Sequence, residues 1–396
     1  MLNVRAWVLR LAAGLAAACH MLVLVAVPEP GQGGLRGLSG KLSGSWESDL
    51  FSYTNEASGE DAASRMQADL KVAYSDAWNE RWEFKLVGRL RWDSESYTDA
   101  AFAFLEDGDE CHAATVDELL LQYHADAYTL SVGKQFLNWS FGDQHMPCDS
   151  INPYDISDVP TLEKIAVPAA SWYHYGGLFD LEAFLVPVFT PARLPAADSR
   201  WFPDRSSVEA EFAAILGFEP TLEFGGRDLP PHSMRHVQGG VRLNSSNLFS
   251  GWDLVLSYYH GIEPVGTYAV DVRPPVVQLT QVFTPFHEFG FGVLTTYDVW
   301  EFHAEAVLQV PEDEDMEDNY WEYVLGLNYT AYHWFAGVHE ETRTSLEYAR
   351  EHLVDGRRQS LQHLDLNHYT RPFKNSVIAA CVFQFNMDTE CSLLSL

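Results

Sequence analysis

The chain has 396 residues, of which 47% are hydrophobic and 13% aromatic, a composition that argues against an intrinsically disordered protein. It carries 25 lysines and arginines against 56 aspartates and glutamates, for a formal net charge of −31. Because affinity for phosphate backbones comes from clustered basic residues, this balance argues against a nucleic-acid-binding protein.

Residues 1–30 have the arrangement of a secretory signal peptide. Two arginines precede an apolar run rich in alanine and leucine, and proline and glycine follow. The alternative is an uncleaved anchoring helix, because the apolar run is long and His20 interrupts it. Beyond residue 35 no stretch approaches the ~20 consecutive apolar residues of a transmembrane helix. We therefore expect residues 31–396 to form one domain that is not a helical bundle.

The segment "ERWEFKLVGRLRWD", residues 80–93, alternates with a period of two. Its even positions are apolar or glycine from Trp82 to Trp92, whereas its odd positions are mostly charged. Side chains on a strand point to opposite faces in alternation, so this strand separates an apolar medium from a wet one. The two tryptophans are ten residues apart, and at about 3.3 Å per residue a tilted strand of this length spans roughly the ~25 Å apolar band of an outer-membrane barrel.

Similar alternation recurs along the chain and predicts about fourteen strands, which start near residues 44, 65, 81, 115, 128, 165, 178, 234, 251, 286, 299, 320, 333 and 371. A soluble β-sandwich is the alternative, but its strands need only ~5 or 6 residues. The predicted fold is an all-β, transmembrane, antiparallel up-and-down β-barrel. The final "CSLLSL" resembles the opening of a further strand, so the chain is expected to be either a fourteen-stranded barrel with an extra tail or a truncated sixteen-stranded one.

The connections between these strands are alternately short and long, as expected for short periplasmic turns and long outer loops. One long connection, residues 190–233, contains helix signals. Ser206 and Glu209 have capping-box spacing, and Gly217 and Pro220 end the segment. We expect a short helix in this outer loop.

No nucleophile elbow, phosphate-binding loop or zinc-protease motif is present, and the chain is predicted not to be an enzyme. Inward carboxylates could be paired catalytic acids, but side chains that line a wet pore and set its ion preference are the simpler interpretation. The predicted pore-lining residues are Asp69, Lys71, Glu83, Lys85, Arg89, Arg91, Asp180, Glu182, Glu301 and Glu305.

The loop at residues 141–164 contains the turn-forming sequence "INPYD". We hypothesise that this loop is rigid, folds toward the lumen and narrows the pore. The predicted constriction residues are Asp149, Asn152, Pro153, Asp155 and Asp158.

Cys111 and Cys148 fall in consecutive outer loops, and a disulfide between them is geometrically plausible. No cofactor is expected. The acidic run at residues 311–319 offers oxygen ligands for surface Ca²⁺ or Mg²⁺, with candidate ligands Glu312, Asp313, Glu314 and Asp315. A solvated acidic loop without metal is the alternative. The expected partners are outer-membrane lipids, lipopolysaccharide and small solutes.

From Gly133 onward the chain resembles a family of porin-like outer-membrane proteins of Gram-negative bacteria. The resemblance rests on "GKQ" with Trp139, on "INPYD" and on "LVPVFTPARLP" at residues 185–195, whereas Gly142 is shifted from the family's position. It implies a β-barrel of uncertain cargo, of a kind sometimes associated with exporters of hydrophobic molecules.

The predicted function is a porin-like channel in the bacterial outer membrane, which the acidic charge makes selective for cations or neutral solutes. One alternative is a component of an export or lipid-transport complex. Another is a secreted, soluble carbohydrate-binding β protein.

Overall fold

The computed structural model describes residues 40–52, 64–94, 98–104, 111–140, 142, 144–157, 162–195, 201, 205–313, 317–332, 341–354, 363–365, 373–386 and 389–395. The predicted signal peptide, Asp158, Glu314 and Asp315 lie outside these ranges. The described part is all-β apart from one α-helix and one short 3-10 helix. None of its helices is long and apolar enough to span a membrane.

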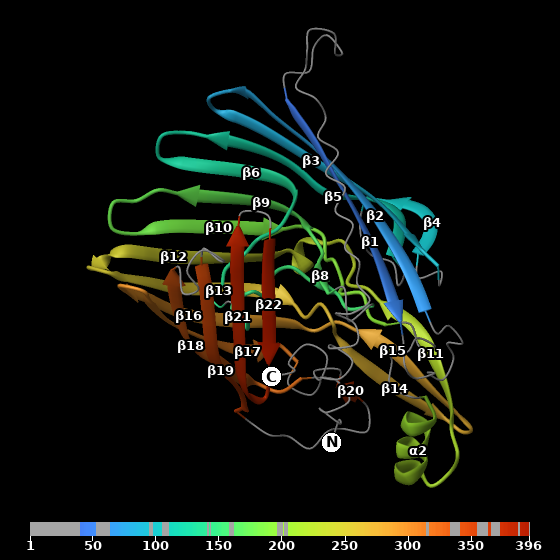
Figure 1. The fold of residues 1–396 in the computed structure, drawn as a ribbon. Coiled ribbons are helices and arrows are strands. Elements are labelled where there is room, and N and C mark those ends of the chain that lie inside the picture. Colours follow the sequence, from blue (N-terminus) through green and yellow to red (C-terminus); the bar gives the residue numbers. More distant parts are fainter. Residues whose placement is uncertain are drawn as a thin grey trace, which may run out of the picture.

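One large antiparallel sheet curls around an interior, and its strands follow the chain order (Figure 1). The first seven strands on its path are β1 (Lys41–Ser52), β2 (Ser64–Asn79), β3 (Trp82–Asp93), β5 (Cys111–His124), β6 (Tyr128–Gln135), β9 (Val167–His174) and β10 (Asp180–Val186). The path continues through β12 (Gln238–Phe249), β13 (Trp252–Ile262), β16 (Pro285–Tyr297), β17 (Trp300–Pro311), β18 (Tyr320–Tyr332), β19 (Glu341–Leu353), β21 (Asn375–Asn386) and β22 (Thr389–Ser395).

The first fourteen of these strands correspond to the fourteen that the sequence predicts, and β22 is the expected additional strand. The sheet is open between its two ends, since no pairing among the described residues joins β1 to β22. The strand predicted at 333–341 lies, except for its last residue, outside the described residues, whereas β19 occupies Glu341–Leu353, most of which the sequence assigns to a long connection. The alternation of β19 is weak in the sequence, because its exposed face carries polar side chains such as Thr344 and Arg350 beside Leu346.

The two faces of the large sheet differ as predicted. On β3, Leu90 and Trp92 are each 56% exposed on the outward face, whereas the side chains of Arg89 and Arg91 between them are largely buried inside. The same outward exposure of large apolar side chains recurs around the sheet, at Trp46, Val132, Leu185, Val241, Leu256, Phe289, Phe291, Phe302, Leu325, Leu346 and Val377. A monomeric soluble protein rarely exposes a continuous apolar surface of this kind, so an apolar medium is expected around it.

Short and long connections leave opposite ends of the sheet. Two-residue turns join β2 to β3, β12 to β13 and β16 to β17, and they lie at the left of Figure 1. The long connections, such as residues 136–166 and 187–237, lie at the other end. The predicted alternation is therefore confirmed. One long connection also contributes β4 (Thr98–Ala103), which pairs in parallel with β5 and was not predicted.

The long connections form a small unit of their own beside the sheet. It contains the predicted helix, observed as α2 (Arg205–Leu216), and a four-stranded sheet in the order β11 (Thr221–Asp228), β15 (Val276–Val282), β14 (Thr267–Arg273) and β20 (His363–Asp365). Phe212 of α2 packs with Leu222, Val277 and Leu279 in a buried apolar cluster. The sequence did not predict this second sheet, because its short strands lie within segments that were assigned to loops.

Candidate functional site

The segment from Phe136 to Ala166 joins β6 to β9 and is called the inner loop below. The side chain of Asn152, which is 1% exposed, accepts a hydrogen bond from the Leu137 amide at 2.7 Å and donates to the carbonyl of Ile165 at 2.9 Å. The amide of Ile165 also donates to the carbonyl of Pro153. These bonds tie the middle of the loop to both of its ends, so "INPYD" closes the base of the loop.

Apolar residues of the inner loop pack against the inward face of the sheet. Trp139 is 2% exposed and meets Phe184 of β10 edge-on, with ring centroids 4.8 Å apart. Tyr259 of β13 contacts Phe184 in turn, and Phe286 of β16 contacts Tyr259. Aromatic pairs in such geometries stabilise a contact by roughly 0.5–1.5 kcal/mol beyond their area burial. This buried cluster fixes the loop inside the curved sheet rather than above it.

Four consecutive strands present one inward carboxylate each to the inner loop: Glu288 of β16, Glu305 of β17, Glu322 of β18 and Glu347 of β19. They are called the acidic wall below, and all are 5% exposed or less.

The inner loop supplies hydrogen-bond donors to every carboxylate of the acidic wall. Ser150 donates to Glu288 at 2.9 Å, and Ser140 donates to Glu305 at 2.5 Å. The ring of His145 lies 2.9 Å from Glu322, and its backbone amide donates to Glu347 at 2.9 Å. Buried carboxylates require such partners. Together these contacts hold this part of the inner loop against the acidic wall, so that the loop covers the wall.

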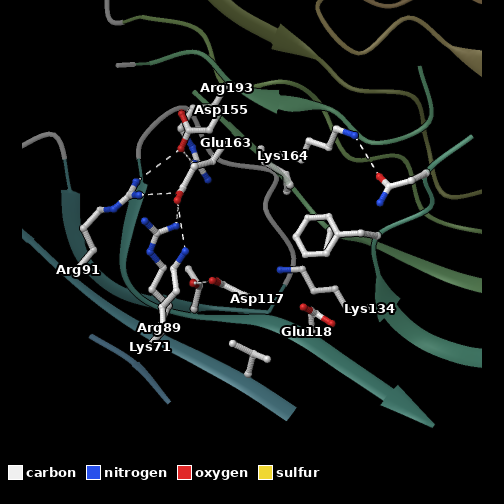
Figure 2. A pocket seen from close by; sticks show the side chains of 16 residues that line it. Lys71, Arg89, Arg91, Asp117, Glu118, Lys134, Asp155, Glu163, Lys164 and Arg193 are labelled. Carbon is white, nitrogen blue, oxygen red and sulfur yellow. Dashed lines mark hydrogen bonds and ion pairs between the residues drawn. The ribbon is translucent and has the colours of Figure 1, made fainter. Parts of the chain in front are cut away.

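The other side of the inner loop faces a group of basic side chains on β2 and β3. Glu163, at the loop's short strand β8 (Glu163–Lys164), accepts from Arg91 at 3.0 Å, from Lys71 at 3.3 Å and also from Arg89 (Figure 2). Asp69 accepts from the two arginines as well, at 2.7 and 3.2 Å. We call Lys71, Arg89 and Arg91 the basic wall. β3 and β17 are far apart in the strand order, so a loop that contacts both walls must cross the enclosed space.

Ion pairs also organise the charges of the loop itself. Burial raises the pKa of Glu163, but the positive charges of Arg89, Lys71 and Arg91 lower it by more. The pKa of this carboxyl therefore lies below its ordinary value of 4.5. Asp155 accepts from Arg193 at 2.5 Å, and Arg91 lies 3.7 Å away. Asp149 pairs with Lys164, yet burial raises the pKa of this carboxyl above 3.8.

A cavity of about 470 Å³ lies between the inner loop and the sheet wall of β2, β3, β5 and β6 (Figure 2). Its charged lining comprises Lys71, Arg89, Arg91, Lys134, Lys164 and Arg193, together with Asp117, Glu118, Asp155 and Glu163. Asp69 and Asp149 pair with three of these basic residues from outside the lining. The cavity is therefore polar and close to balanced in charge.

No protein-family model and no curated protein matches the sequence. Three of the solved structures that resemble it are outer-membrane proteins. A loop-deleted form of OmpT from Vibrio cholerae is 8% identical, with 89% of this chain and 91% of that chain covered and a TM-score of 0.45. Salmonella typhi OmpF in complex with daunomycin is 9% identical, with coverages of 90% and 88% and a TM-score of 0.44. Pseudomonas putida OprB is 11% identical, with coverages of 87% and 84% and a TM-score of 0.41. At these TM-scores the similarity supports no further conclusion about this chain.

The ten predicted pore-lining residues lie in different environments within the structure. Only Lys71, Arg89 and Arg91 line the cavity. Asp69 lies behind the arginines, Lys85 pairs with Glu118 at 2.7 Å, and Glu83 lies 3.7 Å from His124. Toward the short turns, Asp180 accepts from Tyr173 at 3.1 Å and Glu301 from Asn328 at 2.9 Å.

The last two predicted pore-lining residues are Glu182, which lies opposite a basic residue, and Glu305, which lies beneath the inner loop. Glu182 is directly opposite Arg242 in the register of β10 and β12. Glu305 is 2% exposed and bonded to Ser140, so its prediction as a residue lining an open passage is wrong. The physical reason is that the loop covers this part of the inward face.

The predicted constriction residues also separate. Asp155 lines the cavity, Asp149 is buried beside Lys164, and Asn152 and Pro153 are buried in the base of the loop. Their role in narrowing a pore stays a prediction.

Several charged residues of the site were not predicted. Lys134 lies in the "GKQ" motif and Arg193 in the "LVPVFTPARLP" motif. These motifs draw attention to the two segments but do not predict that the two side chains point into the cavity. Gly133 has a φ of 140°, and a Cβ there would collide with the carbonyl oxygen of Leu119. A glycine is therefore required beside Lys134 for β6 to pair closely with β5.

The predicted disulfide between Cys111 and Cys148 is not formed, because Cys148 carries a free, buried thiol. Its sulfur lies next to Gly290 of β16, since the inner loop carries Cys148 into the interior instead of leaving it among the outer loops. Burial, together with nearby Glu305 and Glu288, raises the pKa of this thiol well above 9.0.

The predicted Ca²⁺ or Mg²⁺ site in the acidic run is partly described. Asp313 is exposed, and Glu312 turns toward His260 and His287. Binding of these hard cations by the run stays a prediction.

Proposed function

We propose that the chain is a porin-like channel of the bacterial outer membrane, through which small polar solutes diffuse between the inner loop and the basic wall. The observation that carries this proposal is the cavity of about 470 Å³ on that side of the loop, lined by charged groups inside a sheet with an apolar outer face. The acidic wall, by contrast, is bonded to residues of the inner loop and buried beneath them.

The apolar outer face supports the membrane location. Large apolar side chains exposed on many consecutive strands match the lipid-facing band of an outer-membrane barrel. A secreted soluble protein would leave this surface in water, which is unfavourable at roughly 25 cal/mol per Å² of apolar area. The carbohydrate-binding alternative is therefore not favoured.

The proposed charge preference is weak and toward cations. Within the cavity the basic side chains are matched by carboxylates that lie on or behind the lining, so their local fields largely cancel. The net charge of −31 over the whole chain then sets the potential that an approaching ion experiences. Cations and neutral polar solutes are expected to pass more readily than anions.

Single-channel recording in planar bilayers tests this function. The purified chain should give discrete open currents, and the reversal potential in a KCl gradient should correspond to a modest cation preference. The absence of any open current would contradict the channel and favour the alternative role as a component of an export system. A clear anion preference would contradict the proposed selectivity while leaving the channel intact.

A further inference from the structure

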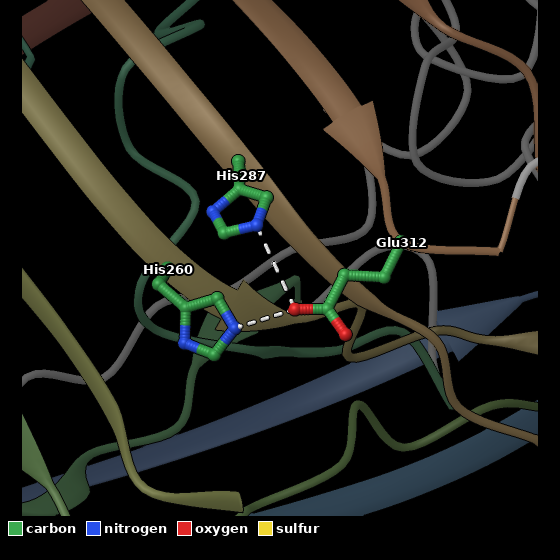
Figure 3. A group of neighbouring side chains, drawn as sticks. All are labelled: His260, His287 and Glu312. Atoms are coloured by element: carbon green, nitrogen blue, oxygen red, sulfur yellow. Dashed lines mark hydrogen bonds and ion pairs between the residues drawn. The ribbon is translucent and has the colours of Figure 1, made fainter.

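Three side chains with metal-binding atoms gather on the outward face of the sheet, away from the cavity. His260 lies near the end of β13, His287 near the start of β16, and Glu312 directly after β17 (Figure 3). His260 and His287 occupy directly opposed positions in the β13–β16 register. Three neighbouring strands thus deliver the three side chains to one place.

These residues belong to the outward face because of the strand alternation. The outward-facing Phe289, two residues after His287, is 50% exposed, whereas Phe286 and Glu288 on either side of the histidine are buried inside. The side chains of His260 and His287 are 28% and 38% exposed, so both are accessible from outside the sheet. The group lies at the end of the strands from which the long connections leave.

The distances suit a single metal ion. One oxygen of Glu312 lies 3.1 Å from Nε2 of His260 and 3.6 Å from Nε2 of His287, and all three ligand atoms lie within 4.8 Å of one another. With metal–ligand bonds of about 2.0–2.1 Å, the ligand atoms of a tetrahedral zinc site are roughly 3.3 Å apart. Two of the three separations are close to this value, and the third is no more than 4.8 Å.

Neighbouring groups hold the ligands in orientation. The hydroxyl of Tyr258 lies 2.9 Å from Nδ1 of His287. When Nδ1 carries the proton and donates it to that hydroxyl, Nε2 keeps its lone pair on the side facing Glu312. The backbone amide of Glu312 donates to the carbonyl of Pro285 at 2.8 Å, which fixes the start of the connection after β17. Supporting hydrogen bonds of this kind are typical of protein metal sites.

We propose that His260, His287 and Glu312 bind a divalent transition-metal ion of the zinc class. Two imidazoles and one carboxylate select such ions over Ca²⁺ and Mg²⁺, which prefer oxygen ligands throughout. Three protein ligands leave a fourth coordination position open to an oxygen donor from outside. This site is independent of the proposed transport function, because none of its residues lines the cavity.

The test is a metal titration of the full chain, folded in detergent and stripped with a chelator. Calorimetric titration with Zn²⁺ should show one site that His260→Ala or His287→Ala weakens by roughly 100-fold or more. Tyr258→Phe should weaken it by about tenfold, as expected for a residue that orients a ligand. Co²⁺ at this site should give the visible absorption of a tetrahedral complex, which the alanine variants lose.

His232→Ala is the matched control, because His232 is exposed in a different connection and is not one of the three grouped residues. It should bind Zn²⁺ as the unaltered chain does, and heat-modifiable gel migration should confirm that every variant is folded. Zn²⁺ binding that is unchanged in a folded His260→Ala/His287→Ala variant would overturn the proposal, as would no binding by the unaltered chain. Displacement of Zn²⁺ by equimolar Ca²⁺ or Mg²⁺ would overturn the assigned metal class.

Discussion

Replacing Glu163 with glutamine should shift the proposed channel toward anions. Glu163 is the carboxylate of the inner loop that pairs with Lys71, Arg89 and Arg91, and all four residues line the cavity. Removing its charge leaves the basic wall with one fewer counter-charge, whereas glutamine keeps the shape and one acceptor oxygen.

The size of the shift follows from Coulomb's law. A unit charge about 5 Å from a passing ion in water contributes roughly 0.8 kcal/mol, and screening with a Debye length of ~10 Å lowers this to about 0.5 kcal/mol. Losing the negative charge disfavours a cation and favours an anion by that amount each. The free-energy difference between cation and anion passage therefore changes by about 1 kcal/mol, so the cation-to-anion permeability ratio should fall roughly fivefold.

The assay is the reversal potential of single channels in a KCl gradient at neutral pH. Glu83→Gln is the matched control, because Glu83 lies on β3, the strand that carries Arg89 and Arg91, but does not line the cavity. It should change the permeability ratio by less than about twofold, since its distance to the passage is greater and solvent screens it. Equal shifts in the two variants, or none in Glu163→Gln, would refute the assignment of the passage to this side of the loop.

Three further predictions concern the inner loop. Asn152→Ala should lower the stability of the loop's base by roughly 2–3 kcal/mol, because it leaves buried backbone groups unpaired. The released loop should give larger, flickering single-channel currents, and steady currents of unaltered size would contradict this prediction. The folded-state pKa of Glu163 lies below 4.5, so its ion pairs stabilise the loop above that pH, and this stabilisation is lost as the pH falls further. Channel fluctuations should therefore increase below about pH 4.5. Glu163→Gln should remove the part of this pH dependence that comes from Glu163. Cys148, with its raised pKa and its burial, should react slowly with a water-soluble thiol reagent and faster in Asn152→Ala, and rapid labelling of the unaltered chain would contradict the buried position.

The sequence alone could predict the strands, their two faces and the side of the long connections. These properties follow from local alternation, which is strong in β3 because Trp82 to Trp92 repeat apolar positions without interruption. It is weak in β19, whose exposed face carries polar side chains such as Arg350, so the sequence assigns most of this strand to a long connection. The helix α2 was also predictable from local signals: Gly217, with a φ of 75°, follows its last residue as expected, although the helix begins at Arg205, so that Ser206 lies within it and not at its N-cap.

The site was only partly predictable, because its contacts join residues far apart in the chain. Alternation places Glu305 on the inward face but does not reveal that Ser140 covers it, 165 positions away in sequence. The turn-forming residues of "INPYD" predict a rigid loop, yet the direction of that loop depends on the fit of Trp139 against Phe184 and Tyr259. The disulfide prediction was wrong for the same reason: the loop's inward path moves Cys148 into the interior.

The pairing of His260 with His287 was likewise beyond the sequence, since it depends on the register between β13 and β16. The acidic run drew attention to Glu312 as a ligand, but the partners offered by the fold are imidazoles rather than further carboxylates.

The inner loop crosses the enclosed space, and we propose that it narrows a passage there. Excision of residues 148–158 with a short glycine linker, followed by measurement of single-channel conductance in planar bilayers, tests this proposal. A folded variant with a conductance well above that of the unaltered channel is the predicted result. An unchanged conductance in a variant whose heat-modifiable migration shows a folded sheet would contradict the claim and leave the loop as a structural element only.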